Sequence, residues 1–247
     1  MKHKHYIATI LFFAILLTSC STRQYVTYSV NNITLPPETA KTIPINVNVK
    51  ILTDHRSKDK ENKILFSSSR TEVSIKGKKM CINAEKKYKK EAVANLITQL
   101  WVKHFNKAKL FANASYNDET ETGYYLTGTL DSFSGRQAVS DAAGDAEALI
   151  IAATLVFGAV GGAIAGGIAG GKYYSPGKIV IEISDLKLFK NDGVLIKDFE
   201  NFRKEYTGNF PVNPRCKCIY QNVNAKLKDF NTELIEKIRV ELSDVKF

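Results

Sequence analysis

The stretch KIVIEISDLKLFKNDGVLIKDFENFRKEY, residues 178–206, decides the fold. Its first half places an isoleucine at every second position, at Ile179, Ile181 and Ile183. A period of two with β-branched residues is typical of a strand with one buried face. The tripeptide Asn191-Asp192-Gly193 then supplies hairpin turn chemistry. We therefore predict that a strand over 178–189 pairs antiparallel with a second strand over 194–206, which carries Phe202 and Tyr206 on one face and Leu195 and Phe199 on the other.

Two amphipathic helices are predicted on either side of this hairpin in the sequence. Residues 221–242 have apolar side chains at three- and four-residue spacing, which makes one buried stripe: Val223, Leu227, Phe230, Leu234, Ile238 and Leu242. The region 83–105 has the same spacing, with Asn83 as the helix cap and a stripe of Val93, Leu96, Ile97, Leu100, Trp101 and Phe105. Both stripes, including the single tryptophan, are expected to pack in the core.

Further strands are predicted upstream of the hairpin. Residues 45–51 alternate between apolar and polar, with Ile45, Val47, Val49 and Ile51 on the expected buried face. Residues 124–133 form another strand, and 64–66 and 72–75 are shorter candidates. The order of elements predicts an α+β fold, with a mostly antiparallel sheet and two amphipathic helices on one face.

This element order resembles that of small periplasmic lipoproteins that serve ABC-type envelope lipid transporters, and that of the curli-secretion lipoprotein domain. The resemblance is carried by the helix near 93–110, the strand 125–130, the turn at 191–193 and the closing helix. It covers most of residues 45–247 as a pattern of elements. It implies a non-catalytic role in an envelope assembly, although residues 146–171 depart from the transport auxiliaries.

The first twenty residues have the layout of a bacterial lipoprotein signal peptide. A basic start precedes an apolar, uncharged run over residues 7–17. The segment ends Leu17-Thr18-Ser19-Cys20, which resembles the lipobox. The resemblance implies cleavage before Cys20 and a diacylglyceryl and acyl anchor on it. Sorting rules in some bacteria, applied to Ser21, favour the outer membrane, with the protein facing the periplasm.

The lipobox divides the chain into three parts. Residues 1–19 are the expected signal peptide, and residues 20–43 are a polar tether that Pro36-Pro37 stiffens. The remainder, residues 44–247, is long enough for a single α+β domain. That domain carries an insertion at 146–171.

The insertion holds a 24-residue stretch, 148–171, without a charged residue. Its glycines form one row at four-residue spacing, with a second row beside it: Gly158, Gly162, Gly166 and Gly170, then Gly167 and Gly171. Such a small-xxx-small groove lets another helix approach closely, whereas in water each glycine would cost a helix about 1 kcal/mol. The segment resembles the glycine zippers of outer-membrane lipoproteins, including the rickettsial surface-antigen type.

We therefore favour an apolar helix or helical hairpin at 146–171 that inserts into a membrane or self-associates. The alternative is a flexible apolar loop, or a hairpin folded onto its own domain. Either possibility is consistent with the charged residues that flank the segment.

Three cysteines remain after Cys20. In an oxidising compartment they favour one disulfide, from Cys81 to either Cys216 or Cys218, which leaves one thiol over. A bridge between Cys216 and Cys218 themselves would be strained. The mature chain has only two histidines, His55 and His104, so we expect no metal site.

The chain is basic, with a formal net charge of +10. Much of the excess lies in one cluster of lysines: Lys76, Lys78, Lys79, Lys86, Lys87, Lys89 and Lys90. For an exported protein such a surface favours anionic lipid headgroups, lipopolysaccharide or the cell wall, and not nucleic acid. The alternative is a solvated loop and first helical turn without a partner.

The sequence has no pattern typical of catalysis. A nucleophile elbow, a phosphate loop, a zinc-binding helix and a paired-carboxylate constellation are all absent from it. We predict a protein that is not an enzyme and uses no cofactor. It would act as a structural or accessory lipoprotein that binds protein partners in a transport or secretion assembly.

Two other functions remain open. One is an oligomeric, membrane-inserting lipoprotein whose zipper helices line a pore or ring. The other is a lipid- or glycan-binding module that uses the lysine cluster.

Overall fold

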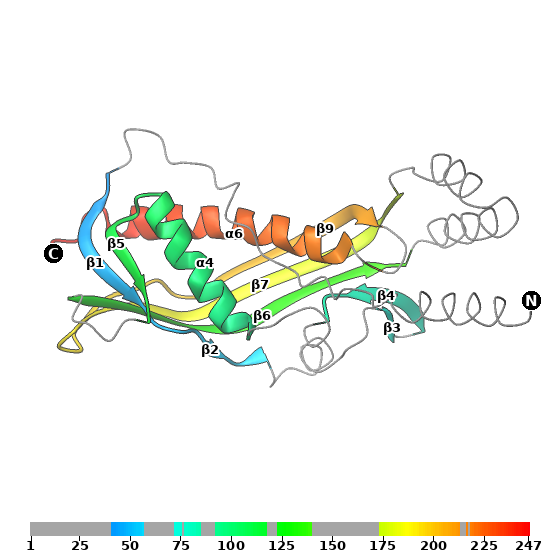
Figure 1. Ribbon diagram of the computed structural model, residues 1–247, viewed down its shortest axis with the longest axis horizontal. Helices are drawn as coiled ribbons and strands as arrows, with labels where there is room; N and C mark the ends of the chain where they lie inside the picture. The colour runs from blue at the N-terminus through cyan, green and yellow to red at the C-terminus, as the bar shows by residue number, and fades with distance from the viewer. Residues whose placement is uncertain are drawn as a thin grey trace, which may run out of the picture.

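The computed structural model describes residues 41–56, 72–75, 77–84, 92–117, 123–139, 173–212, 216 and 218–247. In this part of the chain a long, curled sheet carries two helices on one face (Figure 1). The strands are β1 (Ile43–Val49), β2 (Thr53–Asp54), β3 (Glu72–Ile75), β4 (Lys78–Ile82), β5 (Phe111–Tyr116), β6 (Tyr124–Ala138), β7 (Tyr173–Lys190), β8 (Leu195–Asp198) and β9 (Phe202–Val212). The helices are α4 (Val93–Lys107) and α6 (Cys218–Leu242). The protein is therefore α+β.

The antiparallel pair β6–β7 forms the spine of the sheet. Its register runs from Tyr124 opposite Lys190 to Gln137 opposite Gly177, with two irregularities. The isoleucines that predicted β7 are fully buried against the helices. Both strands extend beyond their predicted bounds, to 15 and 18 residues, because the alternation weakens outside the isoleucine run while the pairing continues.

Among the described strands most pairs are antiparallel, as predicted, but the sheet is mixed, because three pairs are parallel. Strand β1 lies between β5 and β6 and is parallel to both, and β2 is also parallel to β6. Parallel neighbours need a crossover connection, and α4 provides it before β5. Neither β5 nor β4 was predicted, because β5 is short and β4 begins with two exposed lysines.

The second half of the hairpin is broken into β8 and β9. Glu200 has a φ of 59°, so the chain turns between the strands and the alternation of faces restarts. As a result Phe199 and Phe202 are both buried and not on opposite faces, whereas Leu195 is exposed. A similar correction applies to Ile51, which lies beyond the end of β1 and is exposed.

The two helices bury the predicted stripes almost completely. Every predicted stripe residue of α6 is buried, and in α4 only Leu96 is partly exposed. Helix α4 begins at Val93 and not at Asn83. Asn83 instead continues β4, since its backbone N–H donates to the Gly135 carbonyl at 3.3 Å.

A buried polar contact joins α4 to α6. The Trp101 Nε1–H donates to Asn231 Oδ1 at 3.1 Å, and Asn231 Nδ2 donates to His104 Nδ1 at 3.0 Å. Burial, and secondarily the charge of Lys107, lowers the pKa of His104 to about 4. The imidazole is therefore neutral in the folded protein and has a structural place between the helices.

Candidate functional site

The connection from β6 to β7 begins and ends at the same end of the sheet. Strand β6 ends there at Ala138 and β7 begins at Tyr173, so residues 140–172 leave and return at this point. Strand β4 and the start of α6 lie at the same end (Figure 1). We call this region the disulfide end.

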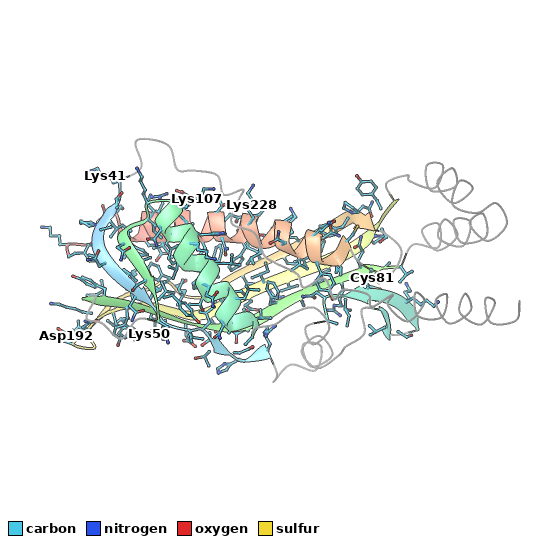
Figure 2. All side chains as sticks on the ribbon, viewed as in Figure 1. Lys41, Lys50, Cys81, Lys107, Asp192 and Lys228 are labelled. Carbon is cyan, nitrogen blue, oxygen red and sulfur yellow. A yellow bond between two sulfur atoms is a disulfide. The ribbon has the colours of Figure 1, made fainter. Side chains whose placement is uncertain are left out.

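The disulfide end is closed by a bond between Cys81 in β4 and Cys216, just before α6. The two cysteines are 135 residues apart in sequence, and both are buried. Cys218 lies outside the bond, so of the two pairings left open the structure has the first. Burial raises the pKa of the Cys218 thiol, which keeps it protonated and a poor nucleophile toward the neighbouring disulfide. Figure 2 marks the position of Cys81.

Two buried amides join three elements beside the disulfide. Gln137 Nε2 in β6 donates to the carbonyls of Phe210 at 2.6 Å and Pro211 at 3.0 Å, both in β9. Asn222 Nδ2 in α6 donates to Gln137 Oε1 at 3.1 Å and to the Pro211 carbonyl at 2.9 Å. Buried amides with satisfied hydrogen bonds fix one arrangement of the elements that carry them.

Hydrogen bonds also hold the last residues of β6 and the first residues of β7. The Gly135 N–H donates to Asn83 Oδ1 at 2.7 Å, and the Val139 N–H donates to the Lys79 carbonyl at 3.2 Å. On the returning strand, Ser175 Oγ donates to the Ala138 carbonyl at 2.7 Å. Both ends of the connection are therefore fixed by hydrogen bonds to the folded domain.

Helix α6 approaches β6 very closely at this end. A Cβ atom on Gly135 would lie 2.3 Å from Val223 Cγ2, which is far inside van der Waals contact. A side chain there would push the helix away from the strand. Gly135 therefore sets the spacing on which the amide contacts depend.

The interactions described at the disulfide end hold strands and α6 together. Among the described residues, no group of three or more His, Cys, Asp or Glu side chains could hold a metal ion. An open, acid-lined depression of about 620 Å³ lies elsewhere, against Asp185, Asp198 and Glu200. There Lys187 Nζ lies 3.2 Å from Asp185 and 3.6 Å from Asp198, so these carboxylates are part of an ion-pair cluster.

The predicted site residues fall largely outside the described part of the chain. Cys20 does so, as do all six zipper glycines and five of the seven clustered lysines: Lys76, Lys86, Lys87, Lys89 and Lys90. The other two, Lys78 and Lys79, are exposed on β4 at the disulfide end. No described helix is both long enough and apolar enough to cross a bilayer.

Sequence reasoning missed the amide contacts of the disulfide end. Asn222 is adjacent to Val223 in the apolar stripe of the closing helix, and a polar residue there is a usable signal. Gln137 lies beyond the predicted end of its strand, so no signal marked it. The pairing of Gln137 with Asn222 is a tertiary contact across 85 residues.

The comparisons give similarity to solved structures alone, since no family model and no curated protein matches the chain. A Xanthomonas campestris protein of the DUF330 family model is 13% identical with a TM-score of 0.45, covering 86% of this chain and 95% of that one. The PelC dodecamer from Paraburkholderia phytofirmans is 8% identical with a TM-score of 0.34, covering 84% and 95%. Rare lipoprotein B from Shewanella oneidensis is 7% identical with a TM-score of 0.29, covering 80% and 93%. At these TM-scores the likeness carries no argument about function.

Proposed function

We propose that the protein is a lipid-anchored bacterial envelope lipoprotein, a non-catalytic accessory component of a transport or secretion assembly. The buried Cys81–Cys216 disulfide carries the proposal. Structural disulfides persist in oxidising compartments and are rare in the cytosol. The bond therefore agrees with the lipobox at residues 17–20, which independently predicts export.

The geometry of the disulfide end supports an accessory role. Hydrogen bonds of Gln137 and Ser175 hold the end of β6 and the start of β7, and the Cys81–Cys216 disulfide lies at the same end of the sheet. The sequence of that connection is apolar and uncharged over 24 residues. Fixed strand ends on either side of such a segment favour binding of a protein partner, because less conformational freedom is lost on binding.

The anchor is tested by replacing Cys20 with Ser in the full chain. Radiolabelled palmitate should enter the wild-type protein and be absent from Cys20→Ser. Cys218→Ser is the matched control and should keep the label. Equal labelling of all three proteins would overturn the lipid anchor.

The accessory role is tested by crosslinking a tagged, lipidated protein in native membranes. A defined partner should be captured at constant stoichiometry, and Gly162→Leu with Gly166→Leu should lose it while palmitate labelling persists. Ile150→Leu, in the same segment, should leave capture unchanged. Capture that is equal in all variants would place the partner contact elsewhere.

A second candidate is an oligomer built through the glycine rows. The hydrogen bond between the end of β6 and the start of β7 favours an oligomer, since each copy would present residues 140–172 from the same place on the domain. Size-exclusion and crosslinking in detergent separate the candidates: deleting 158–171 should abolish oligomers only if the chain self-associates. Oligomers that survive the deletion would exclude a zipper-built ring.

A further inference from the structure

The end of the sheet opposite the disulfide end is where the chain joins the folded domain. Strands β1, β5 and β6 all begin there, and β7 ends there. The Ile43 N–H donates to the Leu110 carbonyl at 2.9 Å, and the Asn191 N–H donates to the Gly123 carbonyl at 3.0 Å. We call this region the lysine end. Figure 2 labels Lys41 and Lys107 there, far from Cys81.

Five exposed lysines give the region its name: Lys41, Lys107, Lys109, Lys190 and Lys246. Within the described residues, none of them has a carboxylate oxygen within 4 Å. Lysines along the strands and α6 are different, since Lys178 pairs with Glu205 and Lys204 with Glu233. The lysine end therefore presents positive charge that the described domain does not neutralise by ion pairs.

Some acidic groups near these lysines are already paired: Glu236 with Arg239, whose guanidinium donates to the Ala108 carbonyl at 3.1 Å, and Asp198 with Lys187. Asp192 and Asp244 are exposed there, and Asp192 Oδ1 accepts the Val194 N–H at 3.1 Å. Three further carboxylates, in residues 118–121, lie outside the described residues. Experiments on the whole chain include their charge.

Apolar side chains are exposed at the same end. Val194 is 55% exposed, Leu195 48% and Phe247 41%. The Phe247 ring packs edge-on against Tyr124 at 5.7 Å between centroids. Cations beside exposed apolar groups suit the boundary of a bilayer, where headgroups meet the charges and the apolar groups enter the acyl margin.

The length of chain before β1 brings this end close to the proposed anchor. Twenty residues separate Cys20 from Lys41. Treated as a random coil, a chain of that length would have a root-mean-square span of about 25 Å. The tether therefore holds the lysine end at high effective concentration near the bilayer that carries Cys20.

We propose that the lysine end rests on that bilayer, through its lysines on anionic phospholipid headgroups and through Val194, Leu195 and Phe247 in the interface. The proposal rests on the lipid anchor proposed above. It adds a second, electrostatic contact and an orientation, with the disulfide end directed away from the membrane.

The test uses the lipidated full-length protein in two kinds of vesicle. One is phosphatidylcholine alone, and the other contains one part phosphatidylglycerol to two parts phosphatidylcholine. An amine-reactive footprint read by mass spectrometry should show at least threefold less modification of Lys41, Lys107, Lys109 and Lys190 in the anionic vesicles. Lys78, at the disulfide end, should react equally in both. Raised salt should remove the protection, because it screens exposed charges.

Paired variants with the same change in net charge sharpen the test. Lys107→Gln with Lys190→Gln should reduce the protection of Lys41 and Lys109 severalfold, since each lysine contributes roughly fivefold to contact with an anionic surface. Lys78→Gln with Lys228→Gln should leave it unchanged.

Two results would overturn the proposal: equal modification in both vesicles, or protection of Lys78 in place of the lysine end. If the lysines were then protected in native membranes, the surface would be assigned to a protein or to lipopolysaccharide. If the protein carries no palmitate, only the anchor proposal fails. The lysine end can then still be tested by flotation of the unlipidated protein with anionic vesicles.

Discussion

The two ends of the sheet are built in opposite ways. At the disulfide end a covalent bond and buried amides close the structure around the strands that bound residues 140–172. At the lysine end the strands start and stop beside exposed lysines and exposed apolar side chains. The difference is that one end is fixed by bonds within the domain, while the other presents exposed groups, which we propose as a surface for contact outside the domain.

Between these ends the described residues form the hydrophobic core. A single hydrophobic cluster runs from β1 and α4 to the start of α6. Within it the Trp101 Nε1–H donates to Asn231 Oδ1 at 3.1 Å. Disturbing one end should therefore reach the other only through loss of the common core.

The largest effect is expected from removing the disulfide. Cys81→Ser with Cys216→Ser should lower the free energy of unfolding by about 2–5 kcal/mol, because the bond constrains a long loop of the unfolded chain. Urea unfolding of the full chain measures the loss, and Cys218→Ser is the control that should change it little.

Hydrogen exchange on the same variants locates the effect. Protection should fall first in β3, β4 and the start of α6, while β1 and β5 keep theirs until global unfolding. A uniform loss along the chain would mean that the two ends are not independent.

The second effect is acid destabilisation through His104. The pKa of His104 is about 4 in the folded protein and about 6.5 when unfolded. Above pH 6.5 the imidazole is neutral in both states. As the pH falls toward 4, the unfolded chain takes up a proton that the folded protein does not, so the free energy of unfolding falls. The linkage amounts to about 3 kcal/mol over this interval. Melting temperature against pH should be less steep there in His104→Gln than in the wild type.

The third effect tests the close contact between β6 and α6. Gly135→Ala should destabilise the protein by about 1–3 kcal/mol, the usual cost of overpacking, since its Cβ would overlap Val223. Val223→Ala in the same chain should recover part of the loss in a double-mutant cycle. Gly128→Ala is the milder control, because its nearest neighbours are the ends of the Leu52, Ile183 and Leu186 side chains, at 3.1–3.3 Å.

The smallest effect is expected at the lysine end. Phe247→Ala removes an exposed ring contact with Tyr124, worth about 1 kcal/mol or less. Thermal unfolding should barely register it, whereas the vesicle footprint should change. A large loss of stability would show that this end is part of the core and not a contact surface.

The sequence predicted the elements whose patterns are local. The alternation at Ile179–Ile183 and the stripe of 223–242 needed no information from the rest of the chain, and both elements are present. Strand β5 carries no alternation strong enough to detect, and β4 is dominated by lysines. The break at Glu200 depends on a backbone conformation that its residue type does not announce.

The candidate site was predicted only at its cysteines. Their number and spacing left two partners open for Cys81, and the choice of Cys216 depends on where β4 and α6 meet. The amides Gln137 and Asn222 interact across 85 residues, so no local pattern could pair them. The zipper glycines stay a prediction, since they lie outside the described residues.

The length of the β6–β7 pair has a consequence for reach. Strand β7 has 18 residues, and at about 3.3 Å per residue it spans on the order of 60 Å. If the lysine end lies on a bilayer as proposed, the length of the β6–β7 pair would set the height of the disulfide end above the membrane. A partner of residues 140–172 would then have to reach that height above the lipid, so under this proposal the domain would act as a spacer.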